Sequence, residues 1–590
     1  MAIFTNVPTT VKNLIEDVKS GRIGLPDLQR PFVWNDAKVR ELFDSMLKGY
    51  PIGYVMLWES PVGYSEKKSA IGTDKKLYEE PKELVIDGQQ RLTALIAAIY
   101  GIPVKDKNYK EHEIKIAFHP LKREFAVWTT PIERDAEWVS KISDAFSAKE
   151  NAEFSKFRRE YIKRLNESKE RKGEELLTDD EEDQIEDSLN ALLNLIDFPL
   201  PKLEISASAD EQDVADIFVR VNSGGQKLTE NNFIQTLIAV YEKEVHDNIT
   251  KFCKDSRIPA SGTSYNHLME IDPQHLIRMA VGLGFHRARL RYAYMLLRGK
   301  DLETGKYSDE TRTTNLNKFK DALNEVMNLN HWHAFLNAVQ DAGYVSSKLI
   351  ASTNAVVYSY VLYLIGKLEY KLETVRLNKL ITKWFFMSAI TYFYTGSTES
   401  EVERQFADLR NIKTADEFEQ YINEIIEGTF TEDYFNITLP NELNTSSAIS
   451  PSWYGYNASI IVLNYPMLFS TSNLATYLIP GASGTKNAID KHHIFPKHYL
   501  TEIGYRSDRE RNQNANYTYL DYATNIDISD DAPSDYIERY REKLGEEQFV
   551  LSCEQNALPE GFENMEYEEF LEKRRKLMAL IVKKAYQRLK

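Results

Sequence analysis

The segment ELVIDGQQRLTAL, residues 83–95, predicts how the N-terminal part of the chain folds. Residues 83–86 form a short apolar run that is typical of a buried strand, and residues 92–100 are typical of an apolar helix. The polar residues 87–91 join the two, so a strand delivers them to the N-terminus of a helix. Free backbone N–H groups and the helix dipole favour a phosphate at such a position.

Two further segments place polar residues at the ends of predicted elements: LPDLQRPFVW at 25–34 and IFVRVNSGGQKLT at 217–229. Arg30 and Arg91 could add charge-assisted bonds to an anion, and Asp87 could hold a metal or a water. No GxxxxGK[ST] loop occurs. The alternative is that Asp87 and Gln89 only cap the helix while Arg91 joins a surface ion pair. We predict an anionic-ligand site made by Gln29, Arg30, Asp87, Gly88, Gln89, Gln90, Arg91 and Asn222.

Helix signals surround these segments. A first helix is expected after Thr9 or Thr10 and should end at Gly21, and Asn35 should cap a second. Strand-like runs continue to about residue 206, and a charged helical insertion is expected near residues 135–195. Residues 1–235 therefore predict an α+β domain.

The remainder of the chain is predominantly helical in pattern. Residues 236–445 predict a helical domain, and the Pro-, Ser- and Asn-rich residues 439–452 are typical of a linker or loop. Residues 446–590 are expected to form a third domain that closes with a basic helix. The predicted fold class is α+β, multidomain and helix-rich.

The composition of the chain limits the classes of protein to which it can belong. The chain has 590 residues, 42% of them hydrophobic, which is enough to bury real cores. Its net charge of −16 argues against a passive DNA coat, which is normally basic. The two cysteines form no CxxC pair and fit a reducing compartment. No signal peptide is apparent, and the apolar runs fall short of the ~20 residues of a membrane span. We expect a cytoplasmic protein with no membrane partner.

The most chemically informative residues lie near the C-terminus, in the segment HHIFP at 492–496. Adjacent side chains of a strand point to opposite faces, so one imidazole can face a metal while the other faces a substrate. Hydrolysis of a phosphodiester needs a base and a cation, and a neutral histidine suits the base at pH 7. Downstream lie NYTYL at 516–520 and then Asn525, whose amide oxygen suits a cation such as Mg²⁺ or Mn²⁺.

This ordered set resembles the HNH (ββα-metal) nucleases, which share a His-x-x-Pro segment, a middle Asn and a final Asn or His. By position, the resemblance implies that His493 is the general base and His492 a metal ligand. It implies further that Asn516 holds the loop that positions the base, that Asn525 is the second ligand and that Asp490 is an additional one. The final position is Asn here, whereas many HNH enzymes have His.

The three N-terminal segments resemble the N-terminal domain of the GmrSD family of type IV, modification-dependent restriction enzymes. Its signatures are Pro-x-x-Gln-Arg-x-x-x-Trp, Asp-Gly-Gln-Gln-Arg and Asn-x-x-Gly, and all three occur here in order. The resemblance implies a ParB/sulfiredoxin-like fold that binds and hydrolyses a nucleoside triphosphate, ATP or GTP, with Asp87 in a catalytic role. It also implies an HNH partner domain and cleavage of phage DNA carrying hydroxymethylated or glucosylated cytosine in antiviral defence.

DNA contacts are expected on the basic helix at residues 570–590, which carries Arg574, Arg575, Lys583 and Lys584. A second basic cluster lies at residues 286–291. An ordinary basic helix end is the alternative for the first cluster. Self-association into a homo-oligomer also remains open.

Alternative functions remain open. Relatives with the same pair of domains respond to phosphorothioate marks, so a phosphorothioate-sensing NTPase and nicking nuclease is one alternative. A second is a nucleotide-switched binding module of a defence complex with a degenerate nuclease. A third is a toxin-like nuclease that acts on host nucleic acid.

Overall fold

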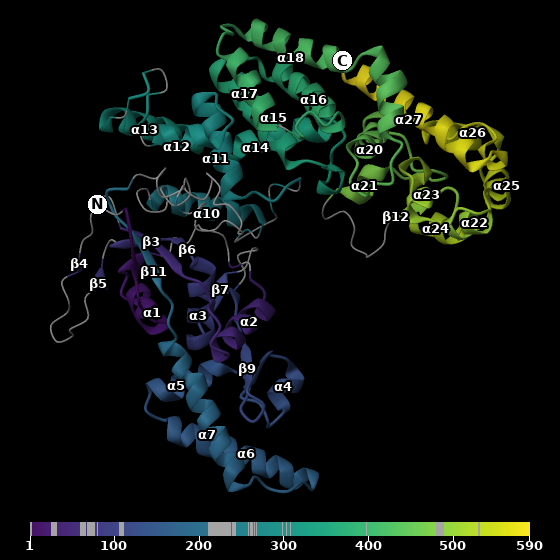
Figure 1. Ribbon diagram of the computed structural model, residues 1–590. Coiled ribbons are helices and arrows are strands. Elements are labelled where there is room, and N and C mark those ends of the chain that lie inside the picture. Colours follow the sequence, from purple (N-terminus) through teal and green to yellow (C-terminus); the bar gives the residue numbers. More distant parts are fainter. Residues whose placement is uncertain are drawn as a thin grey trace. The chain divides into compact units, whose positions relative to one another are not determined.

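The computed structural model describes residues 3–24, 32, 34–59, 66–67, 77–78, 81–105, 111–209, 217, 238, 243–257, 259, 264, 266, 268–297, 299–301, 304–306, 308–396, 398–479, 489–528 and 531–590. The chain forms two compact units, an N-terminal unit up to residue 250 and a C-terminal unit from residue 251 (Figure 1). Both are rich in helix, and a mixed sheet lies in the N-terminal unit. The predicted α+β, multidomain, helix-rich fold class is confirmed.

A five-stranded mixed sheet organises the N-terminal unit. Strand β11 pairs parallel with β3 and antiparallel with β1, while β6 pairs antiparallel with β3 and parallel with β2. The residues of β6 are buried up to Asp87, which is half-buried at the end of the strand, as predicted. In spatial order the strands are β1 (Phe4–Val7), β11 (Lys202–Ile205), β3 (Val55–Glu59), β6 (Glu83–Asp87) and β2 (Ile23–Gly24).

Side-chain caps begin the first helices, as predicted. In α1 (Val11–Lys19) the hydroxyl of Thr10 accepts a bond from the N–H of Asn13 at 3.3 Å. In α2 (Asp36–Leu47) the amide oxygen of Asn35 accepts from the N–H of Lys38 at 2.9 Å. These caps satisfy N–H groups that have no partner within the helix, so the sequence positions both starts.

The other elements of the N-terminal unit include the predicted charged helical insertion. The first four residues of its acidic run, 179–182, form the first turn of α7, where negative charge complements the helix dipole. The elements are α3 (Gln89–Tyr100), α4 (Thr130–Arg134), α5 (Ile142–Glu150), α6 (Phe154–Lys172), α7 (Asp179–Asn194) and η1 (Leu195–Asp197), the hairpin β9 (Ile116–His119) and β10 (Glu124–Val127), and the short strands β4 (Glu66–Lys67), β5 (Leu77–Tyr78), β7 (Val104–Lys105) and β8 (Glu111–His112). Helix α10 (Lys243–Arg257) runs across residues 250 and 251.

The C-terminal unit begins with a helical region whose core is apolar and aromatic. Helix α15 is buried along most of its length and packs on α11 and α16. The elements are α11 (Pro273–Phe285), α12 (Leu290–Leu297), α13 (Asp309–Val326), α14 (Leu329–Asp341), η2 (Ser347–Leu349), α15 (Thr353–Leu364), η3 (Ile365–Glu369), α16 (Thr374–Ile390), α17 (Thr398–Leu409), α18 (Ala415–Thr429) and η4 (Tyr434–Thr438).

The predicted linker or loop at residues 439–452 is irregular only at residues 443–450, and both of its ends are helical. Residues 439–442 form helix α19 (Leu439–Glu442), and helix α20 (Pro451–Leu463) begins before residue 452. Leu439 and Leu443 are buried, and α19 packs against the last helix of the chain. Pro440 and Pro451 lie in first helical turns, where a missing N–H is tolerated. The predicted helical region and the predicted third domain thus pack into one compact unit, and the three-domain division remains a prediction.

The last part of the C-terminal unit contains the predicted ββα arrangement. Strands β12 and β13 pair antiparallel and helix α24 follows directly. None of the described helices is long and apolar enough to cross a bilayer. The elements are α21 (Leu474–Leu478), β12 (Ile489–His493), α22 (Lys497–Glu502), α23 (Asp508–Arg511), η5 (Asn514–Asn516), β13 (Tyr517–Asp521), α24 (Tyr522–Ile528), α25 (Pro533–Leu544), α26 (Glu546–Gln555), η6 (Phe562–Asn564) and α27 (Tyr567–Leu589).

Candidate functional site

In the β12–β13 pair, the side chains of the two adjacent histidines lie on opposite faces. His492 lies opposite Thr518 and His493 lies opposite Tyr517 in the ladder. Because successive side chains of a strand point to opposite faces, the imidazoles have different surroundings, as the sequence predicted.

His492 lies against the helix that follows the pair. Its Nδ1 is 2.7 Å from Oδ1 of Asn525 on α24, and both residues are half-buried. Asp521 caps α24 by accepting a bond from the N–H of Thr524 at 2.9 Å. This cap sets the start of the helix and therefore the position of Asn525 on it. Burial acts to raise the pKa of Asp521, but this bond and its other hydrogen bonds hold it below the ordinary value.

The pair formed by His492 and Asn525 fits a divalent cation. Ligands of a small cation such as Mg²⁺ stand ~2.1 Å from it, so neighbouring ligand atoms come within ~3 Å of each other. Nδ1 and Oδ1 already lie at about that separation, and because the amide oxygen only accepts, Nδ1 would have to release its proton for a cation to bind. Asp490 belongs to β12, but its side chain lies outside the described residues. Among the described residues, no group of three or more His, Cys, Asp or Glu could hold a metal, so water or substrate oxygens would have to complete the coordination.

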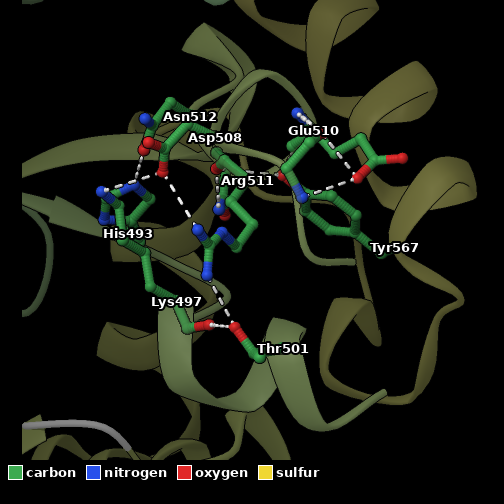
Figure 2. Close-up of polar contacts among 10 residues, drawn as sticks. His493, Lys497, Thr501, Asp508, Glu510, Arg511, Asn512 and Tyr567 are labelled. Carbon is green, nitrogen blue, oxygen red and sulfur yellow. Dashed lines mark hydrogen bonds and ion pairs between the residues drawn. The ribbon is translucent and has the colours of Figure 1, made fainter. Parts of the chain in front are cut away.

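His493 is positioned by a residue that sequence analysis missed. Its Nε2 is 3.0 Å from Oδ1 of Asn512 (Figure 2). An amide oxygen only accepts, so Nε2 carries the proton in this arrangement and Nδ1 keeps a lone pair. Asn512 ends α23, and the preceding Arg511 ties that helix to α22 through a bond from Nη1 to the hydroxyl of Thr501 at 2.7 Å. The alternating asparagines at 512, 514 and 516 are the sequence signal that could have revealed it.

Burial keeps His493 neutral. It disfavours the imidazolium and lowers the pKa of His493 to about 4, although the bond to Asn512 acts in the opposite direction. The positive charge of Lys497 lowers the pKa of His493 further. A histidine with this pKa retains its lone pair throughout the neutral pH range.

We expect His493 to titrate near pH 4 in a ¹³C-histidine NMR titration, with its signal assigned by its loss in His493→Gln. The substitution Asn512→Asp should raise this pKa by about 2 units, because a carboxylate stabilises the adjacent imidazolium. Between pH ~6.5 and ~4 the unfolded chain binds the proton more readily, so this site should lose folding stability as the pH falls. Titration of His493 near its ordinary value in the parent protein would contradict the assignment.

Asn516 holds the turn after the histidines. Its side chain is fully buried, donates to the carbonyl oxygens of Phe495 at 3.0 Å and Arg511 at 3.2 Å, and accepts from the N–H of Phe495 at 2.8 Å. The structure thus brings together His492, His493, Asn516 and Asn525, which the sequence named separately.

Arg574 was predicted to contact DNA, and this prediction is wrong. Its side chain is 0% exposed, so it has no surface to offer a phosphate. Nη1 donates to the carbonyl oxygen of Ala515 at 2.6 Å, and Nη2 to that of Asn556 at 3.5 Å. Arg574 therefore supports the turn that carries Asn516. Arg574 lies four residues after Phe570 and four residues before Met578, so the helix repeat places all three on the buried face of α27.

The other predicted DNA contacts on α27 are accessible to different degrees. Arg575 is half-buried and donates to Oδ1 of Asn444 at 3.0 Å. Lys583 forms an ion pair with Glu432 at 2.7 Å, whereas Lys584 is exposed. In the second predicted basic cluster, Arg287 pairs with Glu403 at 2.8 Å. Contacts of these residues with DNA remain predictions.

The predicted anionic-ligand site lies at the junction of β6 and α3. Asp87 ends the strand, Gly88 is the N-cap residue, and Gln89, Gln90 and Arg91 form the first turn of the helix. Arg91 is half-buried and donates from Nη1 to the carbonyl oxygen of Tyr54 at 2.6 Å, so its guanidinium is held against the fold rather than extended at the surface. Burial lowers its pKa although the charge of Asp87 opposes this. Gln29, Arg30 and Asn222 lie outside the described residues.

Gly88 allows the close approach of β3 to this turn. Its φ is +91°, and a Cβ there would lie 3.2 Å from Cγ2 of Val55 and 3.3 Å from the carbonyl oxygen of Tyr54. Only glycine adopts this backbone conformation without strain. The turn therefore leaves the first N–H groups of α3 near a glycine rather than a bulky side chain.

We expect Gly88→Ala to destabilise the N-terminal unit by about 2 kcal/mol, measured by urea unfolding of the full chain. A non-glycine residue in the left-handed region costs ~1–2 kcal/mol, and the tight contacts with β3 add to it. Gly173→Ala is the matched control, since φ is +71° and nothing lies within 4 Å of the added Cβ; it should cost about 1 kcal/mol. Equal losses in the two variants would show that the contacts with β3 do not matter.

Comparison with known proteins supports the family resemblance of the N-terminal segments. Residues 11–239 match the family described as GmrSD restriction endonuclease, N-terminal domain. The chain is also 23% identical over 557 residues to the uncharacterized protein MJ0686 of Methanocaldococcus jannaschii, a similarity that covers 89% of this chain and 86% of that protein. This match supports a relationship to the GmrSD restriction endonuclease family through residues 11–239.

Proposed function

We propose that this protein is an NTP-regulated, metal-dependent endonuclease that cleaves modified DNA in antiviral defence. The observation that carries the proposal is the pairing of His493 with Asn512 and of His492 with Asn525 on one ββα element. The chain joins this element to a restriction endonuclease N-terminal domain, and restriction endonucleases act on DNA. Hydroxymethylated and glucosylated cytosine are the proposed modifications.

His493 is the proposed general base. With Nε2 bonded to Asn512, its Nδ1 can accept a proton from water, and the oxygen then forms a bond to phosphorus as the bond to the leaving oxygen breaks. The bond to Asn512 keeps the proton of His493 on Nε2, and Asn516 fixes the turn that follows His493. His492 and Asn525 would hold Mg²⁺ or Mn²⁺, which when bound stabilises negative charge on the phosphate and the leaving oxygen.

The β6–α3 junction is the proposed nucleotide site. Phosphates bind readily at a helix N-terminus, where the dipole favours negative charge, and Gly88 places no side chain at this terminus. Arg91 fixes the junction to β3 through Tyr54 and adds positive charge. Asp87 would orient water or a cation beside the triphosphate, ATP or GTP.

A cleavage assay tests the proposed function. The full chain is incubated with unmodified, hydroxymethylated, glucosylated and phosphorothioate DNA, with Mg²⁺, Mn²⁺ or EDTA, and with or without ATP or GTP. Cutting of cytosine-modified DNA that needs the metal and changes with the nucleotide supports the proposal.

Other outcomes assign the alternatives. Cutting confined to phosphorothioate DNA would identify a sensor of that mark, and equal cutting of unmodified DNA would identify a toxin-like nuclease. Nucleotide-dependent DNA binding without any cutting would identify a binding module. Each of these results contradicts the proposed function.

A further inference from the structure

Lys491 shares one face of β12 with His493. The two residues are separated by one position in the strand, so their side chains project from the same side, about 7 Å apart along the chain. Lys491 lies opposite Tyr519 and His493 lies opposite Tyr517 in the ladder. The proposed base therefore has a cation as its neighbour on the same face.

Aromatic rings hold the ammonium group of Lys491. Nζ lies 3.6 Å from the ring centroid of Tyr517 and 5.5 Å from that of Trp453. The ring of Tyr517 also lies 4.5 Å from the imidazole of His493. Tyr517 is thus in contact with both side chains and sets the position of one relative to the other.

Lys491 has no carboxylate within ion-pair distance among the described residues. The residue as a whole is exposed, and its ammonium group lies in the corner formed by the rings of Tyr517 and Trp453. By contrast, Lys115 lies over the ring of Trp128 at 4.7 Å and pairs with Glu113 at 3.1 Å.

We propose that Lys491 binds a phosphate of the nucleic-acid substrate beside the bond that is cut, with Tyr517 aligning its ammonium group. This inference rests on the proposed nuclease function and adds a substrate-binding residue to it. An exposed cation that is held by rings, and that has no carboxylate within ion-pair distance in the described part of the chain, gains a charge-assisted bond when a phosphate oxygen arrives. A lysine offers a point charge, so it would bind the phosphate without reading the base.

The test uses the full chain on its cleavable DNA and measures kcat/KM across a series of salt concentrations. Lys491→Met keeps the apolar stem over Tyr517 and removes the charge, so we expect kcat/KM to fall about 10- to 100-fold. Its salt dependence, plotted on logarithmic axes, should become shallower by about 0.9, the change expected for one lost phosphate contact. Lys491→Arg keeps the charge and should recover most of the activity.

Lys115→Met is the matched control, because it removes a lysine charge held over a ring in the N-terminal unit, outside the residues proposed to contact DNA. It should leave kcat/KM and the salt slope unchanged. Parental behaviour of Lys491→Met, or a loss without a change of slope, would overturn the inference while the nuclease function stands. A parent protein that cuts none of the DNA substrates would instead overturn the proposed function.

Discussion

Replacing His493 with alanine is expected to reduce the rate of DNA cleavage by about 100- to 10,000-fold, the usual contribution of a general base. The imidazole is the side chain at this site whose Nδ1 is left as a proton acceptor by the bond from Nε2 to Asn512. Its low pKa also means that the rate should stay high from pH 7 down to about pH 5 and fall only as the pH approaches 4. Single-turnover cleavage over this pH range measures both effects.

His498→Ala is the matched control for this substitution. His498 lies five positions further along the chain, is exposed, and contacts Glu502 at 3.6 Å on α22. Its loss should change the rate by less than twofold, because within the described residues its ion-pair partner is Glu502 and not a residue of the site around His493. A His493→Ala protein that folds normally and still cuts at the parental rate would remove His493 from the chemistry.

Asn516→Ala is expected to loosen the ββα element by about 3 kcal/mol. The substitution leaves the N–H and the carbonyl oxygen of Phe495 buried without their partner, and each such group costs ~1–3 kcal/mol. Because 1.4 kcal/mol corresponds to a factor of ten, amide protection in peptides from residues 490–525 should fall about 100-fold by hydrogen exchange. Cleavage should fall with it, since the turn that follows His493 is no longer held.

Asn411→Ala serves as the comparison for Asn516→Ala. Asn411 is exposed, and its amide donates to the carbonyl oxygen of Ala407 at 3.3 Å. Removing it should change protection by less than about threefold, since an exposed carbonyl exchanges its partner for water. Equal protection in the Asn516→Ala and parental proteins would show that the turn is held by its other contacts alone, such as the bond from Tyr536 to the carbonyl oxygen of Ile494 at 2.7 Å.

Local signals predicted several features correctly. Thr10 and Asn35 begin their helices because a side-chain cap acts within a few residues. The alternation of His492 and His493 follows from the strand repeat alone. Gly88 could be assigned to a turn because its neighbours in sequence already make a strand and a helix.

Other features depended on partners far away in the sequence. Arg574 has the composition of a DNA contact, yet Ala515 lies 59 residues earlier and accepts its bond. The segment at 439–452 has the composition of a linker or loop, yet the apolar residues at its start are buried where α19 packs against α27. Asn512 was overlooked because its role depends on His493, 19 residues away.

The candidate chemical groups of this protein can be recognised in its sequence: the Asp-Gly-Gln-Gln-Arg turn, the paired histidines and the asparagines that follow them. Those assignments depend on residue type and on short repeats, which act over one strand or one helical turn. Which of these groups lie in contact, which arginine is buried, and which lysine lies beside the proposed base become known from the packing of the folded chain. Burial and long-range hydrogen bonding depend on how distant elements pack, and no local pattern records that.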